Sequence, residues 1–291
     1  MQSLKKTLLG MAATTCLLTL TAPQVQAGQL HNSWNYGIDA FNDGSGGANF
    51  EIKGMAIKET GDKILVAITG GMPLTGAADS GAADGNIGWA DLFFNFTGGN
   101  FQAASNSSSL FGVRFAGTND SYAPTTGVYR NVQATSVTSS NNGYNSLKQY
   151  YDAGWEKTNS LGTDFATAQA VYEYYYPSTV ASNPNSSNTP ILNVISSGTK
   201  VGNINMLTLT DLTAAGLNFG YFGAAGTQTI GFSFDKALLA QGNYIASLWE
   251  ECGNDGVALK GVTTPEPASI FGLAIAGTGL LVGSRRRHKT A

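Results

Sequence analysis

The sequence predicts an all-β protein, either a β-sandwich or a jelly roll. About ten short segments rich in β-branched and aromatic residues alternate with clusters of Gly, Asn, Asp and Ser, which is the pattern of strands and turns. Helical periodicity is scarce, and many short strands joined by polar loops are typical of sandwiches and jelly rolls. Apolar residues make up 42% of the chain, which is enough for a packed core and argues against wholesale disorder.

The first strands predicted along the chain form a hairpin. Residues 50–53 and 55–58 alternate in polarity on either side of Gly54, and residues 63–69 follow a Glu-Thr-Gly-Asp turn. The further strand candidates are residues 91–96, 110–115, 127–138, 170–176, 191–196, 205–210, 217–222, 229–234 and 244–251.

Helices and loops take up the rest. Residues 146–155 are a helix candidate, and residues 235–241 form one helical turn between an Asp235 N-cap and a stop at Gly242. Residues 70–88 form a long loop, and the Pro- and Asn-rich residues 178–190 are the best linker. We favour one domain with a long loop over two small sandwiches, because the halves show no self-similarity.

The N-terminal residues 1–27 have the pattern of a signal peptide. Lys5 and Lys6 precede an uncharged apolar run over residues 8–20, and Val25 and Ala27 place small residues before a cleavage point after Ala27. A run of about 13 residues is too short to span a bilayer, which disfavours a retained anchor. The chain is therefore expected to pass the secretion translocon.

The C-terminal residues 263–291 combine three features. Pro265-Glu266-Pro267 precedes sixteen residues without charge, 268–283, and these precede Arg285, Arg286 and Arg287. Sixteen residues fall short of the usual span of about 20, but Gly and Ala pack closely and Arg side chains can snorkel. We therefore predict a single transmembrane helix in the inner membrane, with the Arg cluster on the cytoplasmic side and the bulk of the chain outside.

This order of Pro-Glu-Pro, apolar stretch and Arg cluster resembles the PEP-CTERM sorting signal of Gram-negative bacteria. The resemblance implies recognition by an exosortase, cleavage near the tripeptide, and delivery to the cell surface or extracellular matrix. An unprocessed C-terminal anchor is the alternative. Residues 232–239, 242–246 and 249–255, together with 88–93, also resemble the sandwich of exosortase-dependent surface proteins, which implies location and fold but no activity.

The composition of the predicted exported domain, residues 28–262, excludes several function classes. Ten basic and eighteen acidic residues give a net charge of −8, which argues against nucleic acid and other polyanions as partners. His31 is its only histidine, which excludes a His-based triad and a His-rich metal site. Cys252 is its only cysteine, so no internal disulfide forms, and we expect this thiol to be buried.

Carboxylates are the remaining catalytic option. A glycosidase needs two of them across a sugar, but Glu250 and Glu251 are adjacent on a predicted strand and point to opposite faces. We therefore expect a protein that is not an enzyme, with a carboxylate glycosidase as the weaker alternative.

Two sets of residues carry ligand hypotheses. A calcium hypothesis rests on four oxygen-bearing residues near Gly-rich turns, Asp79, Asp84, Asn86 and Asp91. Solvated turns are the favoured alternative. A second acidic stretch has Asp39, Asp43 and Gly44 at EF-loop positions one, five and six, but Phe41 and Phe50 at positions three and twelve break that motif.

Aromatic residues carry the second ligand hypothesis. Tyr150, Tyr151 and Trp155 lie close together and could stack on sugar rings, and four more tyrosines crowd residues 172–176. A buried aromatic core is the favoured alternative. The sequence thus predicts an exported, non-catalytic surface or matrix protein, with a carbohydrate-binding module for exopolysaccharide, assisted by calcium, as the second hypothesis.

Overall fold

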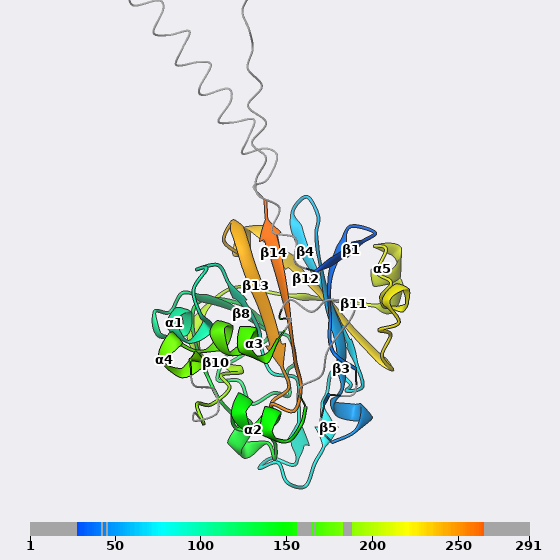
Figure 1. The fold of residues 1–291 in the computed structure, drawn as a ribbon. Coiled ribbons are helices and arrows are strands. Elements are labelled where there is room, and N and C mark those ends of the chain that lie inside the picture. The colour runs from blue at the N-terminus through cyan, green and yellow to red at the C-terminus, as the bar shows by residue number, and fades with distance from the viewer. Residues whose placement is uncertain are drawn as a thin grey trace, which may run out of the picture.

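Two six-stranded antiparallel sheets pack face to face in this protein (Figure 1). The structure is a computed structural model that describes residues 28–41, 43–44, 46–155, 165, 167–182 and 188–264. Strands account for 39% of the structure and helices for 20%, so the prediction of a mostly-β antiparallel fold is confirmed. Ala27 and the signal peptide, like the sorting segment from Pro265 onward, lie outside the described residues.

The first sheet is built around the predicted hairpin. Its two middle strands, residues 52–59 and 63–70, pair in register from Gly54 onward, with an irregularity between Ile52 and Gly54. The turn between them closes with a hydrogen bond from Thr60 N to Lys63 O of 2.8 Å. In spatial order its strands are β1 (Gln29–His31), β2 (Trp34–Ile38), β3 (Ile52–Glu59), β4 (Lys63–Gly70), β12 (Gln228–Asp235) and β11 (Asn205–Leu207).

The second sheet contains the C-terminal hairpin at one edge. In spatial order its strands are β10 (Val194–Gly202), β9 (Gly127–Thr135), β8 (Leu110–Arg114), β7 (Leu92–Asn95), β13 (Gly242–Trp249) and β14 (Gly256–Thr263). β14 continues one residue past the boundary expected at residue 262. Two short strands, β5 (Ala77–Ala78) and β6 (Asn86–Ile87), pair within the long loop over residues 70–88.

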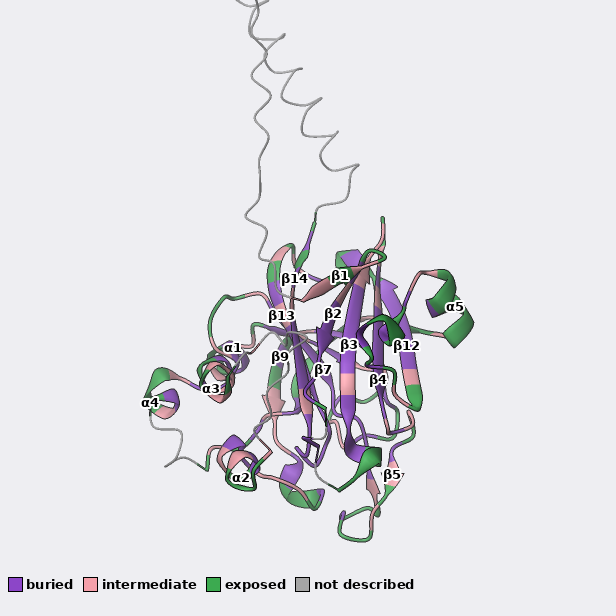
Figure 2. Ribbon diagram, turned by 45° about the vertical axis from the view of Figure 1, so that its right-hand side comes forward, coloured by how far each residue is buried: buried purple, intermediate pink, exposed green. Residues whose placement is uncertain are grey.

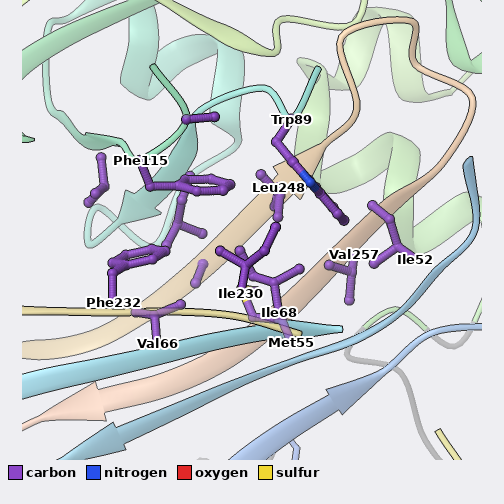
Figure 3. Close-up of a cluster of buried hydrophobic side chains, with 14 of the residues drawn as sticks. Ile52, Met55, Val66, Ile68, Trp89, Phe115, Ile230, Phe232, Leu248 and Val257 are labelled. Carbon is purple, nitrogen blue, oxygen red and sulfur yellow. The ribbon is translucent and has the colours of Figure 1, made fainter. Parts of the chain in front are cut away.

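The main core fills the space between the sheets. Val66 and Ile68 of β4 and Phe232 of β12 face Leu248 of β13 and Phe115 after β8 (Figure 3). The rings of Phe115 and Phe232 stack with their centroids 5.1 Å apart. The inner strands of both sheets are accordingly buried along most of their length, whereas the edge strands β1, β10 and β11 are largely exposed or half-buried (Figure 2).

Short helices cover the outer faces of both sheets. The α-helices are α1 (Phe101–Asn106), α2 (Leu147–Asp152), α3 (Ala168–Tyr175), α4 (Ser178–Ala181) and α5 (Leu209–Ala214). The 3₁₀-helices are η1 (Ala48–Phe50), η2 (Thr138–Ser140), η4 (Phe219–Phe222) and η5 (Lys236–Leu238). α1 and α3 contribute to an aromatic cluster on the second sheet, and α5 and η4 to one on the first. No described helix is long and apolar enough to span a membrane.

Two strand predictions are wrong. Residues 170–176 lie mostly in α3, because the Thr167 side chain caps the helix by accepting from Ala170 N and the tyrosines then pack one helical turn apart. Residues 217–222 end in η4, because the Asn218 side chain accepts from Tyr221 N and Gly223 closes the turn with φ +68°. In both cases aromatic content suggested a strand, and a local cap selected a helix.

The other predictions are mostly correct. The helix expected over residues 146–155 is α2, and the turn over 235–241 contains η5. The strand expected over residues 205–210 ends at Leu207, where the Thr208–Asp211 capping box starts α5. Sequence reasoning did not identify β1, β2, β14 or α1.

One corner of the sandwich brings the start and the end of the domain together. Asn35 Nδ2 of β2 donates to Lys260 O of β14 at 2.8 Å. A Cβ on Gly37 would lie 2.6 Å from Ala258 O, so only glycine permits this approach. The chain leaves β2 at this corner.

We predict that Phe232→Ala lowers the free energy of unfolding by about 3–5 kcal/mol, because it deletes a fully buried ring between the sheets. Urea unfolding of the full chain would measure it. Tyr122→Ala, at a side chain that is 69% exposed, should change the stability by less than about 0.5 kcal/mol. Equal effects of the two substitutions would contradict the described core.

Candidate functional site

Three aspartates from distant parts of the chain meet at this corner. Each of Asp39, Asp43 and Asp255 offers a carboxylate oxygen within 4.8 Å of the others. Asp39 and Asp43 are 7% exposed and Asp255 is 1% exposed. Among the described residues, no other group of three or more His, Cys, Asp or Glu side chains converges in this way.

The segment after β2 places the first two aspartates. Asp39 N donates to Lys53 O at 3.3 Å, which holds this residue beside β3, and Asp39 Oδ1 accepts from Ala40 N at 2.9 Å. Gly44 then lies close to the backbone of Phe50. A Cβ at this position would be only 2.2 Å from Phe50 O, so only glycine permits the approach. Tyr150 Oη of α2 donates to Asp43 O at 3.3 Å from the other side.

The turn between β13 and β14 places the third aspartate. Gly253 has φ +67° and donates to Glu250 O at 3.0 Å, which closes the turn. Asp255 Oδ2 then accepts from Ile52 N at 2.6 Å, and Oδ1 from Gly256 N at 2.7 Å. One carboxylate therefore bonds the C-terminal hairpin to the first residue of β3.

Two glutamates extend the cluster. Glu250 N donates to Asp255 O at 3.1 Å, so these residues face each other at the end of the hairpin and their side chains lie on the same face. Glu250 is completely buried, and its Oε2 accepts from Cys252 Sγ at 3.7 Å. Glu51, just before β3, is also buried.

Burial and mutual repulsion dominate the electrostatics of the cluster. Burial raises the pKa of Asp39 and of Asp255 well above the usual range, and the carboxyl of Asp43 raises both further. Burial, with a contribution from Glu51, likewise raises the pKa of Glu250. Such a set is stable only when protons or a cation neutralise part of its charge.

A second buried network surrounds Glu251, which points away from Glu250. Glu251 Oε2 accepts from Gly88 N at 2.6 Å, and Oε1 accepts from Asp120 N. Burial raises the pKa of Glu251 to about 8, and the carboxyls of Asp120 and Asp84 add to this rise. Glu251 thus anchors two loops at the end of the second sheet.

Asp91 belongs to a similar structural network. Its carboxylate accepts from Ile195 N at 2.7 Å, Ser121 Oγ at 2.5 Å and Asn119 Nδ2 at 3.0 Å. Burial raises the pKa of Asp91 to about 6, although these hydrogen bonds oppose the rise. Asp91 therefore joins the 119–121 loop to β10.

The structure does not gather the other residues of the calcium hypothesis around Asp91. Asp79 Oδ1 accepts from Gly81 N at 2.7 Å, and Asp84 Oδ1 accepts from Asn86 N at 2.9 Å. Both are Asx turns at the surface, in which the side chain replaces a backbone acceptor.

The aromatic residues of the sugar hypothesis pack mainly against each other. Tyr150 is 4% exposed, and its ring meets that of Tyr151 at 74° and that of Trp249 at 88°. Trp155 Nε1 donates to Tyr144 Oη at 2.7 Å, and only Tyr151 and Trp155 of the predicted set are partly exposed. The four tyrosines at the end of α3 are buried, as in the core alternative, and so is Cys252.

Sequence reasoning missed the convergence at Asp255. Asp39 and Asp43 were considered only as part of an EF-loop pattern that Phe41 and Phe50 ruled out, and the third carboxylate comes from a turn about 200 residues further along the chain. Comparison of the chain with protein-family models, curated proteins and solved structures gave no match.

We predict that, in a buffer containing EDTA, the free energy of unfolding of the protein falls as the pH rises from about 4.5 to about 8. In this range folded Glu251 keeps a proton that unfolded Glu251, with a pKa of 4.5, releases, so rising pH favours unfolding. Glu251→Gln removes the titrating group and should flatten this part of the profile. Because its amide nitrogen cannot accept from the N–H of Gly88 or Asp120, its Tm should be lower than that of wild type at pH 5.

Thermal unfolding in EDTA between pH 5 and pH 8.5 would measure the effect. Asp62→Asn, in the exposed β3–β4 turn, serves as a control and should leave the profile unchanged. A Glu251→Gln profile as steep as that of the wild type would show that Glu251 does not bind the proton.

Proposed function

We propose that this protein is an exported, non-catalytic surface or matrix protein that an exosortase sorts and cleaves at its C-terminal signal. The observation that carries the proposal is the position of the folded domain relative to the two expected cleavage points. β1 begins at Gln29, two residues after Ala27, and β14 ends at Thr263, two residues before Pro265. Cleavage at both points would remove no strand from either sheet.

The ends of the domain are consistent with that processing. β1 and the end of β14 lie at the same end of the sandwich (Figure 1). Thr263 Oγ1 donates to Ala240 O at 2.6 Å, and Thr264 N donates to Glu59 Oε2 at 3.1 Å. These bonds hold Thr263 and Thr264 on the domain, just before the expected cleavage point.

On this proposal the chain passes the translocon and is held in the inner membrane by its C-terminal helix. Cleavage by the exosortase then delivers residues from Gly28 onward to the cell surface or extracellular matrix. A single buried thiol suits this route, because Cys252 offers no accessible partner for disulfide exchange.

The environments of the carboxylates support a non-catalytic role. Glu250 faces the buried aspartates, and the Glu251 carboxylate accepts hydrogen bonds from two backbone N–H groups. A glycosidase pair must flank a sugar, whereas these two side chains lie in separate buried networks. His31 stacks on Tyr221 with centroids 3.8 Å apart and joins neither network.

The second candidate function is a carbohydrate-binding module for exopolysaccharide. Tyr151 and Trp155 support it, since they are partly exposed at the end of α2 and could present ring faces to a sugar. Saturable binding of the full chain to the producing cell's polysaccharide, lost in Trp155→Ala and retained in Tyr122→Ala, would establish this function. Absence of binding by a folded protein would leave the non-catalytic surface protein.

We predict that replacing Pro265, Glu266 and Pro267 by Ala blocks release of the protein in an exosortase-positive host. The uncleaved chain should accumulate in the membrane fraction, and this can be measured by immunoblotting of fractions and by the mass of the released C-terminus. Pro124→Ala, on an exposed turn of the domain, should be released normally. Unchanged release of the triple variant would contradict exosortase sorting.

A further inference from the structure

We propose that Asp39, Asp43 and Asp255 form a binding site for one divalent cation, with calcium as the preferred ion and with the buried Glu250 carboxyl beside it. The site lies where the chain leaves β2 and meets the turn of the C-terminal hairpin. It is distinct from the loop residues that the sequence suggested for calcium, and it goes beyond the proposed surface role.

The spacing of the three aspartates fits a single ion. Calcium binds oxygen ligands at about 2.3–2.6 Å, so ligands on opposite sides of the ion lie about 5 Å apart. The carboxylate oxygens of Asp39, Asp43 and Asp255 lie within 4.8 Å of one another. Backbone hydrogen bonds also orient two of the carboxylates. Ala40 N donates to Asp39, and the N–H groups of Ile52 and Gly256 donate to Asp255.

Glu250 gives an independent indication of a ligand. Its Oε1 is buried and has no hydrogen-bond partner among the described residues. The hairpin register places this side chain opposite Asp255 on the same face, and its charge raises the pKa of Asp255. A buried carboxylate oxygen without a donor is destabilising, and a cation at the aspartates would supply the missing interaction.

The chemistry of the ligands favours calcium over other common ions. The three aspartates and the neighbouring Glu250 offer only oxygen, whereas zinc prefers nitrogen and sulfur. Cys252 Sγ donates to Glu250 Oε2 and is not among the side chains that converge with the three aspartates. Magnesium retains several waters, and side chains that are at most 7% exposed favour the more easily dehydrated calcium ion.

Binding would join two ends of the chain. The residues after β2 and the β13–β14 turn belong to different sheets, and the Ile52–Asp255 bond already spans 203 residues. An ion bound only in the folded state stabilises that state in proportion to the logarithm of its concentration. The measurable consequence is a Tm that rises with free calcium.

The test uses the purified full chain after treatment with EDTA. Isothermal titration should give about one calcium ion per chain, and a calcium concentration 100-fold above Kd should raise the Tm by about 5–10 °C. Terbium, which replaces calcium, should luminesce on excitation of Tyr150 and Trp249 near the site, and calcium should quench that signal by displacement. Absence of binding and of any Tm shift up to 10 mM calcium would overturn the proposal.

Variants separate a metal ligand from a merely structural residue. In EDTA, Asp43→Asn should melt no lower than wild type, because it removes one repelling carboxylate, but it should lose the calcium-dependent rise in Tm. Glu250→Gln should lower the affinity for calcium at least tenfold. This second variant tests the proposal even if Asp43→Asn does not fold. Asp62→Asn, exposed on the β3–β4 turn, should retain the full rise. A full rise in both Asp43→Asn and Glu250→Gln would place the ion elsewhere and overturn the proposal.

Discussion

The hydrogen bond from Ile52 N to the Asp255 carboxylate, 2.6 Å long and completely buried, is the constraint on which this corner of the structure depends. It fixes the start of β3 against the turn of the C-terminal hairpin, and so sets how the first sheet lies over the edge of the second. A sandwich of this size would ordinarily place a leucine or valine between its sheets here. Instead the chain buries several carboxyls together, at a cost in desolvation and repulsion that must be offset within the same site.

The strands that could be predicted from sequence are those in which a β-rich residue pattern is bounded by residues typical of turns. The start of β3 alternates in polarity, β4 is a β-rich apolar run, and the two enclose a Gly-containing turn across which they pair. Residues 170–176 have strand-like composition, yet the Thr167 cap and the outer face of the second sheet favour a helix there. The amino-acid composition of a segment does not reveal such a cap. The effect of the cap depends on one side chain and on the surface that the tyrosines cover.

The candidate site was predictable only in part, and for a different reason. The spacing of Asp39 and Asp43 is visible in the sequence, but the calcium-loop pattern that contains them fails at Phe41 and Phe50, so the sequence did not select them. Asp255 and Glu250 become neighbours only through the register of β13 and β14, in which Trp249 pairs with Gly256. Adjacent residues on that turn also have separate roles: Glu250 faces the aspartates, whereas Glu251 accepts from the N–H groups of Gly88 and Asp120. Which face each side chain takes depends on where the strand ends.

The buried acids and the buried Cys252 thiol lead to one physical picture of the described domain. Cys252 is the only cysteine in the part of the chain that the structure describes and it is free, so no disulfide there joins the β2–β3 connection to the C-terminal hairpin. Buried carboxyls with raised pKa values oppose folding as the pH rises toward neutrality, because the unfolded chain ionises them more readily. A divalent cation at Asp39, Asp43 and Asp255 would reverse that effect, since it requires the ionised form and binds only when both segments are in place. The same carboxyls that destabilise an ion-free domain would then join its two ends, in the place where many exported domains use a disulfide.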